Sequence, residues 1–314
     1  MVFDKMDSFL HSARTSGIPR PVDAVTVIIV REGGGTPFEV FLMRRHRDQH
    51  FMGGAYVFPG GRLEETDCDP SLMEWTTGLT AEEAKAKLNE PDLPGERAMG
   101  LFLAAVRETF EEAGVLLAAS SRGEMIGLTD AETQSRFRAH RRKLHCGEIS
   151  LKGLAEGEGL RFMLGLLTPF SHWITPEVEI RRFDTRFLVA RMPEGQSPAH
   201  DSVETVESLW VTPREAIAKN DSGEILLMPP TLKTLDELCQ FRSLDEIFYK
   251  ASQQEINPIL PQPFKSGDAF GVKLPHDPEY SIMAYKRWAS SEEPSRIVFG
   301  NGVWRLSRFH QETP

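Results

Sequence analysis

The sequence has few cysteines and no long apolar stretch. Cys68, Cys146 and Cys239 lie far apart among 314 residues, without the spacing of metal ligands. We therefore predict reduced thiols in a cytoplasmic protein. No apolar run reaches the ~18 residues that a membrane helix needs, and residues 1–21 lack the apolar core of a secretory signal. Residues 311–314 do not form a peroxisomal signal of the Ser-Lys-Leu type.

Positive charge is also scarce. The chain has 36 lysines and arginines against 46 acidic residues, a net charge of −10. Proteins bind nucleic acids and membrane surfaces through positively charged regions of their own surface. We therefore expect neither as a partner. A small anionic substrate is still compatible with this balance, because a bound metal ion can supply positive charge locally.

Residues 102–117 combine an apolar stripe with a group of acids. At about 100° per residue, a helix here places the two sets on opposite sides. The apolar set is Phe102, Val106, Phe110, Ala113 and Leu117. The acids are Glu108, Glu111 and Glu112. We expect the stripe to be buried and the acids to be exposed.

Three carboxylates this close repel one another unless a cation lies among them. Carboxylate oxygens suit Mg²⁺ or Mn²⁺, which leave coordination positions for water and substrate phosphates. A solvated acidic helix face is the alternative. Arg107 beside the acids, Gly114 after them and a Pro-Gly-Gly turn at residues 59–61 favour a metal site.

These residues resemble the signature of the Nudix hydrolases, GxxxxxE, seven residues, then RExxEExG and an aliphatic residue. The second half matches from Arg107 to Val115, with Thr109 where an aliphatic residue is usual. In the first half, Gly61 is followed six residues later by Asp67 instead of Glu. Asp67 lies 40 residues before Arg107. An insertion of about residues 68–97 therefore splits the signature.

The split signature is similar to that of peroxisomal coenzyme A diphosphatases. Further similarity lies in residues 51–61, which end in Phe-Pro-Gly-Gly, in Thr175-Pro176 and in residues 181–187. His50 stands where the coenzyme A motif has an arginine. The resemblance covers about residues 23–218. It implies an α/β/α sandwich with a mixed sheet, here with extra C-terminal helices and a β-hairpin tail.

The resemblance also implies roles for individual residues. Glu108, Glu111, Glu112 and the carbonyl of Gly60 would hold the metal, and Arg107 would hold a carboxylate in place. The general base would be Glu204, or Glu207 as second choice, from the loop before Trp210, or one of the signature acids such as Glu111. For Gly60 and Gly61 the alternative role is a plain tight turn.

A basic cluster ends the second expected strand. Arg44 or Arg45 could hold a substrate phosphate, as Gly61 could by letting the backbone approach it. The alternative for the arginines is a solvated loop.

The predicted reaction is metal-dependent hydrolysis of a diphosphate bond in a nucleoside diphosphate derivative. Coenzyme A or its acyl esters are the substrates that the resemblance favours first, followed by ADP-ribose and NADH. A noncatalytic nucleotide-sensing module is the alternative of a different kind, and a homodimer is a further possibility that the sequence leaves open.

The remaining patterns predict the other elements. Residues 25–30 and 38–43 alternate as a β-hairpin, and 182–190 and 206–211 as further strands. Helices are expected at 81–88, 129–144 and 214–218, one or two more at 231–252, and a hairpin near 296–306. We predict an N-terminal extension (1–22), a Nudix domain (23–228) and a C-terminal extension (229–314).

Overall fold

The computed structural model describes residues 18–47, 52–201, 205–266, 269–288 and 293–309. In this part of the chain, eight strands form a mixed sheet in the order β10-β2-β1-β9-β8-β11, with β3 paired to β2 and β4 to β1. The strands are β1 (Val22–Arg31), β2 (Glu39–Arg45), β3 (Tyr56–Val57), β4 (Gly60–Arg62), β8 (Thr168–Ile174), β9 (Phe183–Arg191), β10 (Thr205–Val211) and β11 (Pro258–Ile259).

The sequence of β1 suits its place in the middle of the sheet. It runs parallel to β9 and antiparallel to β2, with Val30 opposite Val40, so the predicted hairpin is confirmed. Successive side chains point to opposite faces of a strand. Val25, Val27 and Ile29 enter one hydrophobic core, and Ile28 and Val30 enter the other. A strand covered on both faces needs apolar residues throughout, which accounts for its unbroken apolar sequence.

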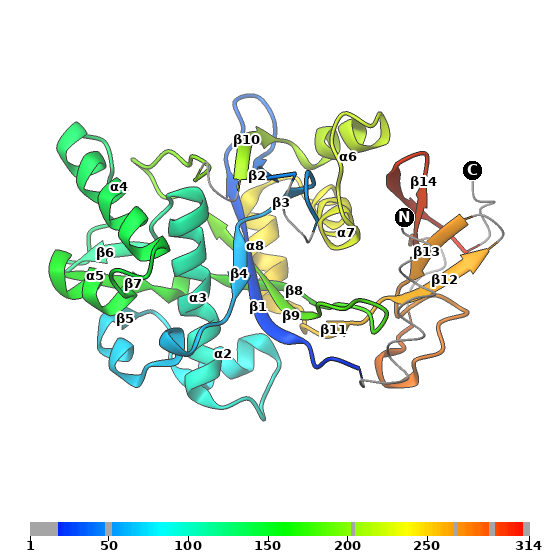
Figure 1. The fold of residues 1–314 in the computed structure, drawn as a ribbon, viewed down its shortest axis with the longest axis horizontal. Helices are drawn as coiled ribbons and strands as arrows, with labels where there is room; N and C mark the ends of the chain where they lie inside the picture. Colours follow the sequence, from blue (N-terminus) through cyan, green and yellow to red (C-terminus); the bar gives the residue numbers. More distant parts are fainter. Residues whose placement is uncertain (1–17, 48–51, 202–204, 267–268, 289–292, 310–314) are drawn as a thin grey trace.

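Helices cover both faces of the sheet (Figure 1). On one side lie α2 (Ala81–Leu88), α3 (Gly95–Ala113), α4 (Ala131–His145) and α5 (Leu151–Glu158). On the other side lie α6 (Pro213–Asp221), α7 (Pro229–Leu238) and α8 (Leu244–Gln253). The α/β/α sandwich is therefore confirmed, and residues 231–252 contribute two helices.

The insertion in the signature folds onto the α3 side. The 3₁₀ helix η1 (Glu65–Cys68) leads into it, and it contains the 3₁₀ helix η2 (Pro70–Trp75), then β5 (Thr76–Thr77) and α2. A small sheet joins β5 to β7 (Leu160–Met163) and β6 (Ala118–Ser120), and η3 (Leu164–Leu166) follows β7. Arg186 on β9 donates to both carboxylate oxygens of Glu90, at 2.8 and 2.6 Å, and so ties the end of α2 to the main sheet.

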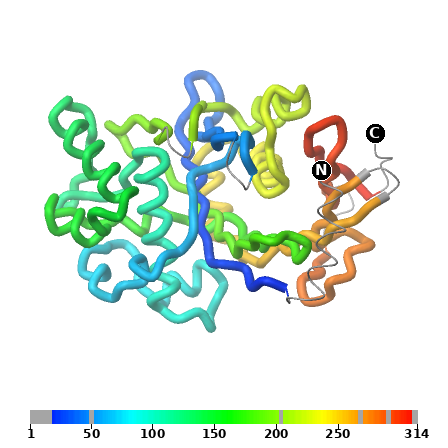
Figure 2. The backbone as a smooth tube through the Cα atoms, in the orientation of Figure 1, coloured from blue at the N-terminus to red at the C-terminus, as the bar shows by residue number. Residues whose placement is uncertain are grey.

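A second sheet occupies the end of the molecule opposite to α4 and α5 (Figure 2). Its antiparallel strands are β12 (Gln262–Ser266), β13 (Ala269–Lys273), β14 (Arg296–Gly300) and β15 (Val303–Ser307). The predicted hairpin is its β14–β15 half, turning at Asn301 and Gly302 in left-handed conformations. The C-terminal tail therefore contains a four-stranded sheet, larger than the hairpin alone that the sequence predicted.

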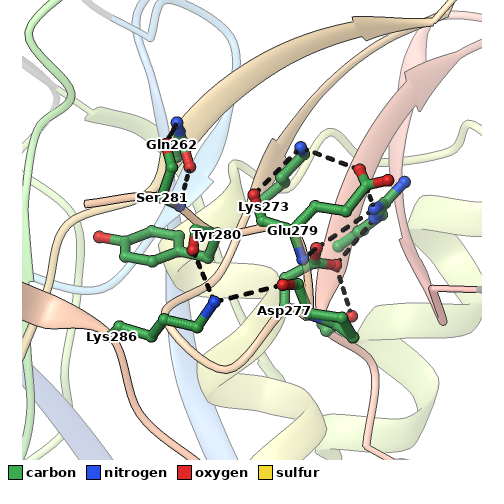
Figure 3. A network of polar contacts seen from close by, with 10 residues as sticks. Gln262, Lys273, Asp277, Glu279, Tyr280, Ser281 and Lys286 are labelled. Carbon is green, nitrogen blue, oxygen red and sulfur yellow. Dashed lines mark hydrogen bonds and ion pairs between the residues drawn. The ribbon is translucent and has the colours of Figure 1, made fainter. Parts of the chain in front are cut away.

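Asp277 organises the long loop between β13 and β14 (Figure 3). Its fully buried carboxylate accepts hydrogen bonds from Ser295 Oγ and Arg296 Nε at 2.8 Å, and from the Glu279 amide at 2.9 Å. Lys286 Nζ donates to the carbonyl of Tyr280 at 2.9 Å. These bonds fix the loop against β14 and so support the hairpin. No helix in the described ranges is both long and apolar enough to cross a membrane.

Candidate active site

Arg107 on α3 is paired with Asp67 on η1. Its Nε and Nη2 each donate to one oxygen of Asp67 at 2.9 Å, and Nη2 also donates to the carbonyl of Arg62 at 2.8 Å. Both side chains are buried, and the Glu64 amide adds a third donor to Asp67 at 2.9 Å. The structure therefore brings the displaced acid of the signature onto its arginine across the insertion.

The remaining donors of Arg107 face the acids of the same helix. Nη1 lies 2.8 Å from Glu108 Oε1 and 3.4 Å from Glu111 Oε2. Glu112 points to the turn before β4, where its Oε2 accepts a hydrogen bond from the Gly60 amide at 2.8 Å. One guanidinium and one backbone turn thus orient the three carboxylates.

The three acids are buried, which corrects the expectation of an exposed acidic face. Their exposed fractions are 9% for Glu108 and Glu111 and 5% for Glu112, because β4 and η1 lie against this side of α3. Burial raises the pKa of Glu108 to about 7, with Arg107 opposing the shift and Glu111 adding to it. Burial likewise raises the pKa of Glu111 to about 7, again opposed by Arg107. The negative charge of these carboxylates therefore exceeds the positive charge of Arg107.

Gly60 and Gly61 must each be glycine, for different steric reasons. A Cβ on Gly60 would lie 2.2 Å from the carbonyl oxygen of Val25 and 2.7 Å from the Cα of Thr26, both backbone atoms of β1. A Cβ on Gly61 would lie 2.2 Å from Glu108 Oε1. Gly60 therefore permits the pairing of β4 with β1, and Gly61 leaves space for a signature carboxylate.

Arg141 on α4 holds the C-terminal end of α3. It donates from Nε to the carbonyl of Glu111 and from Nη2 to that of Glu112, both at 2.7 Å. Nη2 also donates to the carbonyl of Ala199 at 3.0 Å. Gly114 ends the helix in a left-handed conformation, and a Cβ there would lie 2.9 Å from Nη1 of Arg141. One side chain thus joins the backbone of two signature acids to the loop before β10.

The carboxylates fit a divalent cation by the chemistry of their donors. In the described part of the chain, no three ligating side chains converge on one point, because Glu108 and Glu111 turn toward Arg107 and Glu112 toward Gly60. Their ionisation at neutral pH nevertheless calls for more positive charge than Arg107 provides, as the raised pKa values of Glu108 and Glu111 indicate. Oxygen-only donors favour Mg²⁺ or Mn²⁺ over softer metals.

The other predicted site residues have different locations in the structure. Glu204 lies outside the described residues. Glu207 pairs with Arg44 at 2.9 Å, away from the acids of α3. Along β2, Leu42 belongs to the core under α7 and Met43 to the core under α3. Alternation therefore places Arg44 on the α7 side of the sheet and Arg45 on the α3 side.

Sequence reasoning missed the role of Arg141 and left that of Asp67 open. The six-residue spacing from Gly61 to Asp67 was a usable signal, because the signature has its first acid at that spacing. No comparable signal marks Arg141, which lies in the helix that the sequence predicts at residues 129–144. Its three hydrogen bonds within the described residues go to backbone carbonyls, which residue types do not reveal.

Comparisons with known proteins give a consistent result. A family model described as the NUDT19 Nudix domain matches residues 22–238. The acyl-coenzyme A diphosphatase NUDT19 of Gallus gallus is 30% identical over 285 residues, covering 79% of this chain and 74% of the chicken protein. The protein of the same name from Xenopus laevis is 25% identical, and the match covers 69% of this chain but 64% of the frog protein, just under two thirds of its length.

A solved structure agrees with the architecture. The crystal structure of a Nudix hydrolase from Alicyclobacillus acidocaldarius superposes with a TM-score of 0.63 at 25% identity, covering 77% of this chain and 100% of that one. The family model spans more than half of the chain and includes Asp67, Arg107 and the three buried glutamates. With its signature closed in space by the Asp67–Arg107 pair, this chain belongs to the Nudix hydrolase family.

Proposed function

We propose that this protein hydrolyses the diphosphate bond of coenzyme A or an acyl-coenzyme A, with Mg²⁺ or Mn²⁺ as cofactor. The observation that carries the proposal is the buried set of Glu108, Glu111 and Glu112 oriented by Arg107 and Gly60. A noncatalytic sensor has no need of three buried acids with a shortage of cations. The coenzyme A substrate is proposed because the Gallus gallus and Xenopus laevis relatives are named acyl-coenzyme A diphosphatases.

Glu108, Glu111 and Glu112, with the carbonyl of Gly60, would hold the metal ion. The bound ion would neutralise diphosphate oxygens and make the attacking water more acidic. Arg107 favours the ionised forms of Glu108 and Glu111 and holds both side chains in place through charge-assisted hydrogen bonds. Asp67 fixes the guanidinium from its other side, so that the arginine cannot turn away from the acids.

The attacking water must also lose a proton. A carboxylate beside the attacking water is the usual acceptor. Glu111 is our candidate among the described residues, because its buried carboxylate lies beside Arg107 in the proposed metal site. Glu204 is the second candidate, by its position in the loop before β10.

The test is an assay of the purified protein with Mg²⁺ and a panel of coenzyme A, an acyl-coenzyme A, ADP-ribose, NADH and diadenosine polyphosphates. Mass spectrometry should detect a 4′-phosphopantetheine product from coenzyme A. Glu112→Gln should lower the rate by about 100-fold or more, whereas Glu96→Gln, an exposed acid in the first turn of the same helix, should not. Near-native turnover by Glu112→Gln at saturating Mg²⁺ would show that the ligands are wrongly assigned.

A further inference from the structure

A cavity of about 180 Å³ lies on the opposite side of β2 from the signature acids. Arg44, Arg47 and Tyr56 line it from the β2–β3 region, and Gly223 and Glu224 from the loop after α6. Gly302 and Val303 complete the wall from the turn between β14 and β15. That hairpin lies beyond residue 238, the last one matched by the family model.

The cavity has unused capacity for an anion. Arg44 pairs with Glu207 at 2.9 Å, yet its buried Nε has no hydrogen-bond partner among the residues that the structure describes. Arg47 is exposed and forms no ion pair with the described residues. Among the described residues that line the wall, Glu224 is the one acid, and it is paired with Lys219 outside the cavity. The guanidinium of Arg47 is therefore left uncompensated, and arginine binds phosphate oxygens through paired donors.

The rim of the cavity is open. Gly223 and Gly302 adopt φ values of +78° and +83°, and nothing lies within 4 Å of a Cβ built on either one. Entering groups can therefore pass both turns without displacing a side chain. The volume greatly exceeds that of a single water site and accommodates a phosphoryl group with its ester carbon.

The cavity is joined to the catalytic turn by a short segment of chain. Tyr56 in its wall is four residues before Gly60, so the two Cα atoms are at most about 14 Å apart. A substrate whose diphosphate lies at Gly60 could extend past the end of β3 and place a second anionic group between Arg44 and Arg47.

We propose that this Arg44–Arg47 cavity binds a phosphomonoester on the nucleoside half of the substrate, separate from the diphosphate that is cleaved. The C-terminal hairpin would then form part of the specificity site. The inference rests on the proposed function for its substrate, but the binding itself needs no turnover.

Calorimetric titration of the full-length, metal-free protein with adenosine 3′,5′-bisphosphate and with AMP tests the proposal. Wild type should bind the bisphosphate about tenfold more tightly or better. Arg47→Ala should remove that preference and leave AMP binding unchanged. Arg31→Ala removes the same charge from the far end of the β1–β2 hairpin, where Arg31 pairs with Glu39, and should keep the preference.

The hairpin has its own matched pair of variants. Asn and Asp both tolerate the left-handed backbone of Gly302, and they differ in charge. Gly302→Asp should weaken bisphosphate binding several-fold more than Gly302→Asn. The proposal is overturned if wild type shows no preference, if Arg47→Ala keeps it, or if Arg31→Ala loses it equally. A preference without hydrolysis of coenzyme A would refute the proposed reaction and leave the cavity assignment intact.

Discussion

Replacing Asp67 with Asn tests whether the displaced acid completes the signature. The change keeps the shape of the side chain but removes the charge that receives two 2.9 Å hydrogen bonds from Arg107. Breaking a buried ion pair typically costs 3–5 kcal/mol. Arg107 keeps Glu108 and Glu111 as partners, at 2.8 and 3.4 Å, which places the cost near the lower limit. We expect the free energy of unfolding to fall by about 3 kcal/mol and hydrolysis to fall with it, because the guanidinium loosens.

Urea unfolding followed by circular dichroism measures the first effect, and the coenzyme A assay measures the second. Glu65→Gln is the matched control, since Glu65 lies in the same 3₁₀ helix, has a side chain that is 94% exposed and forms a loose ion pair with Arg97 at 3.8 Å. It should change the free energy of unfolding by less than about 0.5 kcal/mol. If Asp67→Asn were as stable and active as Glu65→Gln, the ion pair would not have the role assigned to it.

Three further changes have separable outcomes. Gly61→Ala should abolish most activity with the fold retained, because its Cβ would meet the Glu108 carboxylate. Gly60→Ala should lower the melting temperature, because its Cβ would meet the backbone of β1. Equal effects of the two variants on activity and melting temperature would contradict this. Arg141→Ala should raise the Mg²⁺ concentration for half-maximal rate about tenfold, with Arg141→Lys between it and wild type; an unchanged Mg²⁺ dependence would refute a positioning role. In metal-free protein the pKa of Glu108 rises from 4.5 to about 7 on folding, so the folded state holds more protons between these values and stability should fall as pH rises through them. Urea unfolding in EDTA at pH 5 and pH 8 measures this, and Glu108→Gln should reduce the slope.

The central sheet and the signature helix could be read from the sequence because periodicity reports burial. The apolar run of β1 and the stripe through Phe102, Val106 and Phe110 predicted these elements, although α3 ends at Ala113, before the predicted Leu117. Periodicity could not reveal that the acids on the other side are also buried. Their cover comes from β4 and η1, and polarity alone does not distinguish an exposed carboxylate from one held by a buried arginine.

The C-terminal sheet was harder to predict for a different reason. β12 contains Pro263 and β13 contains Gly271, two residue types that normally argue against a strand. β12 is an edge strand, where proline is tolerated because one side of the strand needs no partner. A Cβ on Gly271 would lie 2.7 Å from the carbonyl oxygen of Ile297 on the paired strand β14, so glycine permits that close approach. Both exceptions depend on neighbours that are distant in the sequence.

The insertion does not disrupt the signature, because the contacts of the signature require only that its two halves lie next to each other in space. The entropic cost of closing a longer loop grows slowly with its length, about 0.6 kcal/mol for each doubling. At its far end, Arg97 pairs with Asp23 on β1, and Glu90 pairs with Arg186, which also contacts Asp23 at 2.5 Å. These pairs anchor residues 90–97 to β1 and β9 and so fix where α3 begins. The Asp67–Arg107 pair can then form as it would without an insertion, which is why the motif survives in space although it is broken in sequence.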